Sequence, residues 1–266
     1  MLPPDCHIHT PLCRHAEGAP AEYVEAARRR GLPAVCFADH CPVPDGYDPN
    51  YRMGMEDFPA YCASVRALQR SDGPAVLLGI EADYYPGCEA YLPGWLGRQE
   101  FDLVIGSIHY IAEWGFDNPA EIRGWESADV PTIWGRYFRL LTDMVRTGLY
   151  DIVGHADIPK KFGHRLAPDV LVELADPVLS AVADAGMAVE LNTSGLRKPI
   201  GEIYPSLPVL SGARRKGIPI CFGSDAHKPS EVGACFDAAV ALARQAGYTS
   251  YVTYRRRRAT SCPLPP

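Results

Sequence analysis

Short apolar runs alternate with longer amphipathic segments along the whole chain. The short runs have the length of buried strands, and the longer segments repeat their apolar positions with the period of a helix. The pattern predicts strands at 4–8, 33–38, 75–81, 102–108, 151–154, 187–191 and 218–223. It predicts helices at 20–30, 56–70, 88–98, 131–147, 168–185, 206–216 and 229–245. Such regular alternation predicts an α/β fold in which helices cover a parallel sheet, either open or closed as a barrel.

The composition fits one soluble globular domain. A chain of 266 residues with 47% hydrophobic content can bury a substantial core, and it contains no internal repeat, low-complexity segment or linker. We therefore expect a single domain over residues 1–266. No apolar run approaches the roughly 18 to 20 residues that span a bilayer, and the N-terminus lacks a signal-peptide pattern. These features predict a cytoplasmic protein without a membrane partner.

Cysteine spacing and net charge exclude several classes of protein. The nine cysteines are an odd number without C-x-x-C spacing, which argues against a disulfide framework and a structural zinc site, so we expect reduced thiols. The net charge of −6 disfavours a broad basic face that would hold nucleic acid. The exception is the run Arg255 to Arg258, which we interpret as a solvated or salt-bridged end. The sequence does not indicate an oligomeric state.

Histidines and carboxylates gather where the predicted strands end. His7 and His9 are two residues apart in DCHIHT, so on a strand they point to the same side. Other candidates follow or end the later strands, namely His40, Glu81, His109, His155, Asp225 and His227, while Glu190 and Asn192 lie in the sixth. Because parallel strands of a barrel bring their carboxyl ends to one rim, these side chains are expected to converge there.

The converging side chains predict a metal centre. A single histidine beside a strand is usually a hydrogen-bonded structural residue, but imidazoles and carboxylates packed together are costly to desolvate unless they bind divalent metals. Nine candidate ligands result: His7, His9, His15, His40, Glu81, His109, His155, Asp225 and His227. With about three protein ligands per catalytic ion, they would serve up to three metals.

The order of the strands suggests how the ligands are divided. Closing the first strand against the seventh would place Asp225 beside His7 and His9, and these three with Glu81 could hold one ion. The second oxygen of Glu81 could bridge to an ion held by His109 and His155. A third ion would then be held by the remaining ligands, His15, His40 and His227.

Eight segments in this order resemble the polymerase and histidinol phosphatase (PHP) family, and within it the histidinol-phosphate phosphatases. They are DCHIHT at 5–10, CRHAEG at 13–18, DH at 39–40, GIEAD at 79–83, GSIHY at 106–110, GHAD at 154–157, ELNTSGLR at 190–197 and GSDAH at 223–227. D-x-H-x-H alone is shared with other metal-dependent barrels, but the ordered set is specific. The chain departs from the common pattern at Arg14, where relatives have proline.

The resemblance implies a fold and an activity. The fold would be a distorted (β/α)7 barrel of the TIM-barrel type, with a trinuclear metal centre that divides its ligands as described above. The activity would be hydrolysis of L-histidinol phosphate to L-histidinol and phosphate in histidine biosynthesis. The ions could be zinc, manganese or iron, since histidine and carboxylate ligands accept each of them.

Clustered divalent ions suit the hydrolysis of a phosphomonoester. They make hydroxide available at neutral pH, neutralise phosphoryl oxygens and orient in-line attack. We therefore expect a metal-bridging hydroxide to attack phosphorus, with Glu81, Asp225 and His227 as the catalytic side chains. The proton for the leaving group could come from a metal-bound water or from His227.

Loops at the same rim supply candidate substrate contacts. Arg165 and Arg197 are the expected phosphate ligands, because a guanidinium can bind two phosphate oxygens at once. Asn192 and Ser194 either bind substrate or shape their loop. The neighbouring pair of Lys160 and Lys161 is interpreted as part of a solvated loop.

Other residues of the rim have open or structural assignments. The imidazole and ammonium of histidinol would suit a carboxylate, and Glu17, Glu113 and Asp117 are alternatives. Arg14 either assists phosphate binding or faces solvent. His164 lies outside the expected ligand set and is interpreted as a surface or loop-packing residue.

Two alternative functions stay open at this point. A nucleotide phosphatase or exonuclease of the same family would use the same metals, although the acidic net charge disfavours a nuclease. A metal-dependent binding protein without turnover is the alternative from another class.

Overall fold

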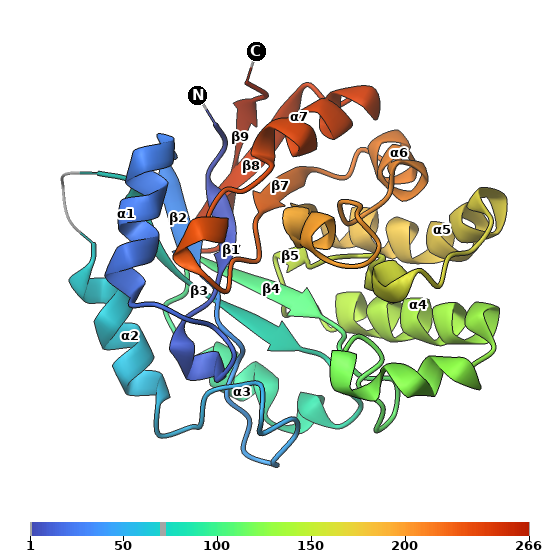
Figure 1. Cartoon of the computed structure of the whole chain (residues 1–266), viewed down its shortest axis with the longest axis horizontal. Coiled ribbons are helices and arrows are strands. Elements are labelled where there is room, and N and C mark those ends of the chain that lie inside the picture. The colour runs from blue at the N-terminus through green and yellow to red at the C-terminus, as the bar shows by residue number, and fades with distance from the viewer. Residues whose placement is uncertain (1, 70–72, 266) are drawn as a thin grey trace.

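Seven parallel strands form one sheet whose strand order follows the sequence. The computed structural model describes residues 2–69 and 73–265. The strands are β1 (Asp5–Ile8), β2 (Ala34–Phe37), β3 (Ala75–Asp83), β4 (Leu103–Ser107), β5 (Ile152–Val153), β6 (Ala188–Asn192) and β7 (Ile220–Gly223). Helices surround the strands on the outside (Figure 1). The seven predicted strands are thus confirmed, with ends that differ by at most a few residues.

The first and last strands of the sheet close it into a distorted barrel. Instead of a regular ladder, a single bridge joins Ile8 to Ala226, and the backbone N–H of Asp225 donates to the carbonyl of His7 at 2.8 Å. The carboxylate of Asp5 also accepts hydrogen bonds from the backbone N–H groups of Ser224 and Gly233, at 2.9 and 2.8 Å. The expected (β/α)7 barrel is therefore confirmed, and its seam is held by a few specific contacts.

Seven α-helices follow the strands in the described part of the chain. They are α1 (Pro20–Arg30), α2 (Phe58–Ala67), α3 (Leu92–Leu96), α4 (Val130–Arg146), α5 (Pro168–Ala185), α6 (Leu207–Arg215) and α7 (Phe236–Gln245). All except α7 carry a proline at the first or second position, where no intrahelical N–H is needed. The left-handed Gly31 and Gly186 end α1 and α5, whose bounds equal the predicted ones.

Several predicted helices are shorter than expected, and two of them begin with a separate 3-10 turn. The segment 88–98 divides into a 3-10 turn, Cys88–Ala90, and the five-residue helix α3. The segment 229–245 becomes a 3-10 turn, Pro229–Glu231, followed by α7, because Gly233 and Cys235 have positive φ angles that a helix cannot contain. The predicted end of the helix 56–70 lies outside the described residues, and α2 ends at Ala67.

Short 3-10 segments occupy most of the connections at the carboxyl ends of the strands. Besides Cys88–Ala90 and Pro229–Glu231, they are Pro11–Cys13, Pro119–Glu126, Ile158–Phe162 and Thr193–Arg197. Among the described residues, no helix is both long and apolar enough to cross a membrane. All nine cysteines are free and seven are buried, in agreement with the expected reduced thiols.

An antiparallel hairpin that the sequence pattern did not predict closes the amino end of the barrel. It consists of β8 (Ser250–Arg255) and β9 (Arg258–Pro263). Val252 and Tyr254 of β8 are buried in the same apolar cluster as strand residues from the barrel interior. The hydroxyl of Tyr254 donates to the carbonyl of Asp151, just before β5, at 3.1 Å. The hairpin therefore fills the end of the barrel opposite to the carboxyl rim.

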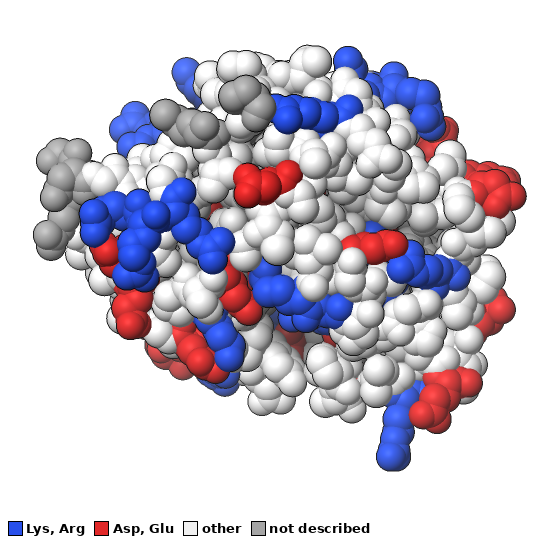
Figure 2. Space-filling view, turned by 45° about the horizontal axis from the view of Figure 1, so that its top comes forward, with Lys and Arg blue, Asp and Glu red and all other residues white. Residues whose placement is uncertain are grey.

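The run of four arginines forms the turn of this hairpin. The Nε of Arg257 lies 2.9 Å from a carboxylate oxygen of Asp151, and the backbone N–H of Arg256 donates to Asp102 at 3.1 Å. The interpretation as a salt-bridged end agrees with these contacts. On the face shown in Figure 2, lysines and arginines lie in separate groups among acidic residues.

Candidate metal centre

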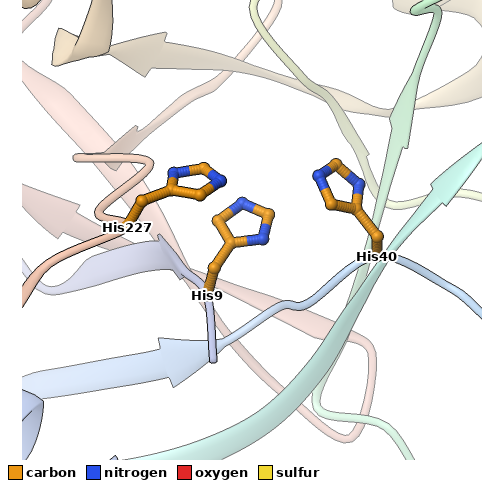
Figure 3. A group of neighbouring side chains, drawn as sticks. All are labelled: His9, His40 and His227. Carbon is orange, nitrogen blue, oxygen red and sulfur yellow. The ribbon is translucent and has the colours of Figure 1, made fainter. Parts of the chain in front are cut away.

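All nine expected ligands gather at the carboxyl ends of the strands. A cavity of about 560 Å³ opens there, and seven of the nine line it: His15, His40, Glu81, His109, His155, Asp225 and His227. His7 and His9 are fully buried. The imidazoles of His9, His40 and His227 come from three separate segments and project toward a common space (Figure 3), with one nitrogen of each within 4.8 Å of the others.

The first expected group of four ligands is assembled at the barrel seam. The Nε2 atoms of His7 and His9 are 3.1 Å apart. The same nitrogen of His7 lies 3.3 Å from Oε2 of Glu81, and that of His9 lies 3.2 Å from Oδ1 of Asp225. Imidazoles and carboxylates from β1, β3 and the segment after β7 therefore point at one small volume.

Glu81 faces a second group with its other carboxylate oxygen. Its Oε1 lies 3.1 Å from Nε2 of His155 and 3.8 Å from Nε2 of His109. Oε2 instead faces His7 and also lies 3.0 Å from Nδ1 of His40. The two oxygens of one buried carboxylate are thus directed to two sets of histidines, which is the arrangement that a bridging ligand requires.

The third expected group surrounds the entrance of the cavity. The ring centroids of His15 and His227 are 4.4 Å apart, and those of His15 and His40 are 5.5 Å apart. His9 connects this group to the buried ligands, because its ring stacks on His227 at 4.1 Å. The structure therefore brings the nine residues together in one continuous cluster.

Buried carboxylates orient three of the histidines. The Nδ1 atom of His7 lies 2.8 Å from Glu190, that of His109 lies 3.1 Å from Asp83, and that of His9 lies 3.4 Å from Asp39. Such contacts fix the ring and leave Nε2 for a metal.

Backbone carbonyls orient two more of the histidines. Nδ1 of His15 lies 2.8 Å from the carbonyl of Cys13, and Nδ1 of His227 lies 3.0 Å from that of Asp225. Sequence reasoning assigned no role to the three orienting carboxylates. A signal existed for Glu190, which is the single acidic residue of the fully buried strand β6.

The donor set and its unsatisfied atoms fit divalent metal ions. The buried Nε2 of His227 finds no hydrogen-bond partner among the described residues. An unpaired buried nitrogen costs free energy that coordination to a cation would recover. Imidazole nitrogens mixed with carboxylate oxygens are the ligands that zinc, manganese and iron accept.

The electrostatic environment keeps the carboxylates ionised. Burial would raise the pKa of Glu81, but His7 and His40 hold it well below its usual value. Burial would likewise raise the pKa of Asp225, but His7 and the hydrogen-bonded His9 hold it well below its usual value. The charges required for binding a cation are therefore already favoured by the protein.

The histidines fall into two classes by their pKa. Burial lowers the pKa of both His40 and His227 well below 6.5, and the neighbouring His9 lowers both further. Burial would also lower the pKa of His7, but the carboxylates of Glu190 and Glu81 outweigh it and raise the value well above 6.5. Neutral imidazoles, which can act as ligands, are thus favoured near the cavity entrance.

Asn192 at the end of β6 and Ser194 after it hold the carboxylate of Asp225, and Arg197 holds the backbone beside it. The amide nitrogen of Asn192 and the hydroxyl of Ser194 donate to Oδ2 of Asp225, at 3.3 and 3.0 Å. Asn192 is buried, whereas Ser194 and Arg197 line the cavity. Nη2 of Arg197 donates to the carbonyl of Ser224 at 2.7 Å. Asn192 and Ser194 are expected from the sequence either to bind substrate or to shape their loop, and these contacts agree with the second role.

Comparison with known proteins identifies the family. The model of the PHP domain matches residues 5–194, and that of a PHP-associated segment matches residues 209–237. A probable histidinol-phosphatase of Deinococcus radiodurans is 44% identical over 256 residues, which cover 96% of this chain and 97% of the relative. This chain belongs to the PHP family.

Further relatives of this PHP protein agree in sequence and fold. The histidinol-phosphatase of Bacillus subtilis is 28% identical over 88% of this chain and 97% of its own length. The crystal structure of a histidinol phosphate phosphatase from Lactococcus lactis, complexed with Zn, L-histidinol and phosphate, matches with a TM-score of 0.85 and 22% identity. The match covers 97% of this chain and 98% of that one, and it establishes a shared fold.

Arg165 of the PHP domain lies away from the cavity, contrary to the expected phosphate contact. It is half exposed, its Nη1 lies 2.6 Å from Glu202, and it is absent from the described residues that line the cavity. The loop after β5 turns at the left-handed Gly163, and Arg165 beyond it lines a neighbouring surface groove of about 620 Å³.

Contrary to expectation, the lysine pair before Gly163 does not belong to a solvated loop. Lys160 is buried, and its Nζ lies 3.0 Å from Asp157 and donates to the carbonyl of Ile203 at 2.8 Å. Lys161 lines the PHP cavity and lies 3.0 Å from Asp117. A 3-10 turn at Ile158–Phe162 directs both side chains inward, and a local sequence reading could not show this.

The remaining candidates around the PHP cavity occupy different positions. His164 stacks on Trp125 of the 3-10 segment Pro119–Glu126 with ring centroids 4.2 Å apart, so it packs its loop against the segment after β4. Asp117 lines the cavity, whereas Glu113 is exposed and Glu17 is exposed and pairs with Lys228 at 3.0 Å. Arg14 is exposed, and its guanidinium donates to the carbonyl of Pro49 at 2.5 Å.

Proposed function

We propose that this chain is a metal-dependent phosphomonoesterase that hydrolyses L-histidinol phosphate to L-histidinol and phosphate, a reaction of histidine biosynthesis. The observation that carries the proposal is Glu81, whose two oxygens face two separate sets of histidines at the base of a cavity with cationic residues in its wall. The relative from Deinococcus radiodurans, similar over nearly its whole length, supports the choice of substrate.

Three divalent ions, zinc, manganese or iron, are proposed for the cluster. His7, His9, Glu81 and Asp225 would hold one, Glu81 with His109 and His155 a second, and His15, His40 and His227 a third. The zinc in the Lactococcus lactis protein supports the kind of metal. When bound, such ions provide hydroxide at neutral pH and neutralise the charge on phosphoryl oxygens.

Arg197 is the proposed phosphate ligand of the chain itself. Its Nη2 is fixed by the carbonyls of Ser224 and Asp225, and its Nε lies 3.4 Å from Glu231. Its Nη1 has no hydrogen-bond partner among the described residues. The guanidinium is therefore held in place at the cavity wall while one of its nitrogens keeps an unused donor, which a phosphate oxygen would accept from.

His227 is assigned to metal binding and not to protonation of the leaving group. Its Nδ1 faces the carbonyl of Asp225 at 3.0 Å, and its buried Nε2 has no hydrogen-bond partner among the described residues, so Nε2 is the nitrogen left for an ion. Once Nε2 binds an ion, the ring has no further nitrogen that could exchange a proton with the alcohol.

Residues 1–266 are proposed to act as a single phosphoesterase domain. The PHP match ends at residue 194, before β7, but the ring of ligands requires Asp225 and His227 beyond it. The hairpin of β8 and β9 then fills the amino end of the same barrel.

Two measurements test the proposed function. Phosphate release should be faster with L-histidinol phosphate than with nucleoside monophosphates or oligonucleotides. Elemental analysis of protein purified without chelator should find more than one divalent ion per chain, and chelation should abolish turnover. Full activity of the metal-free protein, or a preference for nucleotides, would contradict the proposal.

A further inference from the structure

The two sides of the cavity carry different chemistry. Four cationic residues line it from the segments after β5, β6 and β7, namely Lys161, Arg197, Lys198 and Lys228, together with Tyr204 and Glu231. Acidic and aromatic residues without a cation line it from the segments after β2 and β4, namely Asp48, Tyr51, Tyr110 and Asp117. Because the strands follow each other around the barrel, these two sets occupy adjoining parts of the rim, which meet where Lys161 faces Asp117 at 3.0 Å. The cavity is thus polarised from a cationic to an acidic and aromatic wall.

Of the two carboxylates in the acidic wall, Asp48 has the less complete counter-charge. Asp117 faces Lys161 at 3.0 Å. Asp48 instead shares the guanidinium of Arg52 with Asp83: Nη2 of Arg52 lies 2.9 Å from Asp83 and 3.4 Å from Asp48. Asp83 also faces Nδ1 of His109 at 3.1 Å, whereas Asp48 has only this shared and more distant guanidinium as its counter-charge at the wall.

The backbone and two neighbours fix the carboxylate of Asp48. Its φ of +46° lies in the left-handed region, which residues other than glycine seldom adopt. The hydroxyl of Tyr110 donates to Oδ1 at 2.8 Å, and Nε of Arg52 donates to the backbone carbonyl of Asp48 at 3.2 Å. With its side chain only 9% exposed, the carboxylate is preorganised at the cavity wall.

We propose that Asp48 is the specificity-determining residue for phosphomonoesters whose alcohol carries a positively charged nitrogen. The inference rests on the proposed function, because binding of phosphate at the cationic wall directs the alcohol toward Asp48. Tyr51 and Tyr110 flank that part of the cavity, and aromatic faces also favour cations. A cavity of about 560 Å³ has the size of a small-molecule site.

The Asp48→Asn variant tests the charge alone. Asparagine tolerates a left-handed backbone and still accepts a hydrogen bond from Tyr110, so the loop conformation is preserved. We expect kcat/KM for L-histidinol phosphate to fall about 10- to 100-fold, as for the loss of one charged hydrogen bond. For 3-phenylpropyl phosphate, which has no cation, we expect a change of less than about threefold. The analogue 3-(imidazol-4-yl)propyl phosphate keeps the imidazole of L-histidinol phosphate but lacks its ammonium group. If Asp48→Asn also lowers kcat/KM for this analogue, Asp48 contacts the imidazole; if it does not, Asp48 contacts the ammonium group.

Matched variants separate this effect from a general loss of structure. Asp45 is a carboxylate of the same loop that accepts a hydrogen bond from Tyr85 at 2.6 Å, and it lies outside the described cavity lining. In Asp45→Asn, both substrates should therefore react as in the wild type. Tyr110→Phe releases the carboxylate of Asp48 and should lower the rate with L-histidinol phosphate only. Arg197→Ala should lower the rate with both substrates.

The ratio of kcat/KM for L-histidinol phosphate to that for 3-phenylpropyl phosphate decides whether the inference holds. An equal loss on both substrates in Asp48→Asn and Tyr110→Phe, or no loss on L-histidinol phosphate, overturns the role of Asp48. A wild-type enzyme that hydrolyses 3-phenylpropyl phosphate but not L-histidinol phosphate overturns the proposed function instead. In that case kcat/KM is measured with phosphorylethanolamine, another cationic monoester, and divided by the value for 3-phenylpropyl phosphate. If Asp48→Asn lowers this ratio, the role of Asp48 is supported. If the ratio does not change, the role is overturned.

Discussion

Glu81 is the residue on which the two buried groups of ligands depend. Its oxygens lie 3.3 Å from His7 and 3.1 Å from His155. In Glu81→Ala, adjacent cations would repel each other without a shared anion between them. We expect fewer metal ions per chain and a proportionate loss of turnover, both measured on the same preparation by elemental analysis and phosphate release.

A neutral control for this variant is Glu113→Ala. Glu113 is an exposed acidic residue of the segment after β4. Its replacement should leave metal content and turnover at the wild-type level. If Glu81→Ala kept its full metal content, the bridging role assigned to Glu81 would be wrong.

His155 and His164 give a matched comparison of two histidines in the same loop region. Nε2 of His155 lies 3.1 Å from Glu81, whereas His164 stacks on Trp125. We therefore expect His155→Ala to lose bound metal and activity, and His164→Ala to keep the metal and most of its activity. Equal metal loss in the two variants would show that the ligand of the fifth strand had been assigned to the wrong histidine.

The convergence of the nine candidate ligands could be predicted from sequence because it follows from strand order. All of these side chains except His15 stand within a few residues of a strand end, and a parallel barrel brings those ends together; His15 follows the 3-10 turn Pro11–Cys13 after β1. The contacts made by loops could not be predicted in the same way. Arg165 and Lys161 are four residues apart, but the left-handed Gly163 between them directs one to an exterior groove and the other to the cavity.

The hairpin of β8 and β9 is the element that the sequence pattern did not reveal. Two-residue hairpin turns with positive φ at both central positions usually contain asparagine or glycine. Here Arg256 and Arg257 occupy them, with φ of 47° and 61°, and contacts to Asp102 and Asp151 hold the turn. The turn is thus specified by distant carboxylates, which local sequence rules cannot take into account.

Tyr254 should make the hairpin a major source of stability. It is buried in the barrel interior and bonds to the carbonyl of Asp151. Truncation of a buried aromatic side chain costs about 3 to 5 kcal/mol, so Tyr254→Ala should lower the free energy of unfolding by that order. Urea unfolding measures the change.

The matched control on the hairpin is the exposed Arg258. Arg258→Ala should change the free energy of unfolding by less than about 0.5 kcal/mol. Because the hairpin fills the end of the barrel away from the ligands, folded Tyr254→Ala should retain its metal content. Wild-type stability of Tyr254→Ala would contradict the packing role.

The cluster as a whole should make the metal-free protein sensitive to acid. His40 and His227 have pKa values well below 6.5, so protonation favours the unfolded chain as the pH falls below 6.5. Glu81 and Asp225 have pKa values well below 4.5 and 3.8, so their stabilisation is present above those values and is lost as the pH falls further. His7 does not offset these losses. Because its pKa is raised in the folded protein, its contribution to stability is already complete at pH 6.5 and does not increase as the pH falls further.

Chelated protein should therefore lose stability steadily between about pH 6.5 and pH 3. Urea unfolding at a series of pH values measures this slope. In Glu81→Gln the slope at the acid end should be smaller, since one ionised carboxylate has been removed. A metal-free protein whose stability did not change over this range would show that the cluster is not held in these protonation states.

The seam of the barrel places a condition on synthesis of the protein. Asp5 and Ser224 are 219 positions apart, so a growing chain carries β1 without its β7 neighbour until most of the polypeptide has left the ribosome. During that interval one edge of β1 remains open, and His7 and His9 lack Asp225 as a companion ligand. The complete metal centre can therefore form only after the seam has closed, and we expect nascent chains to acquire their full set of ions late, after translation of β7.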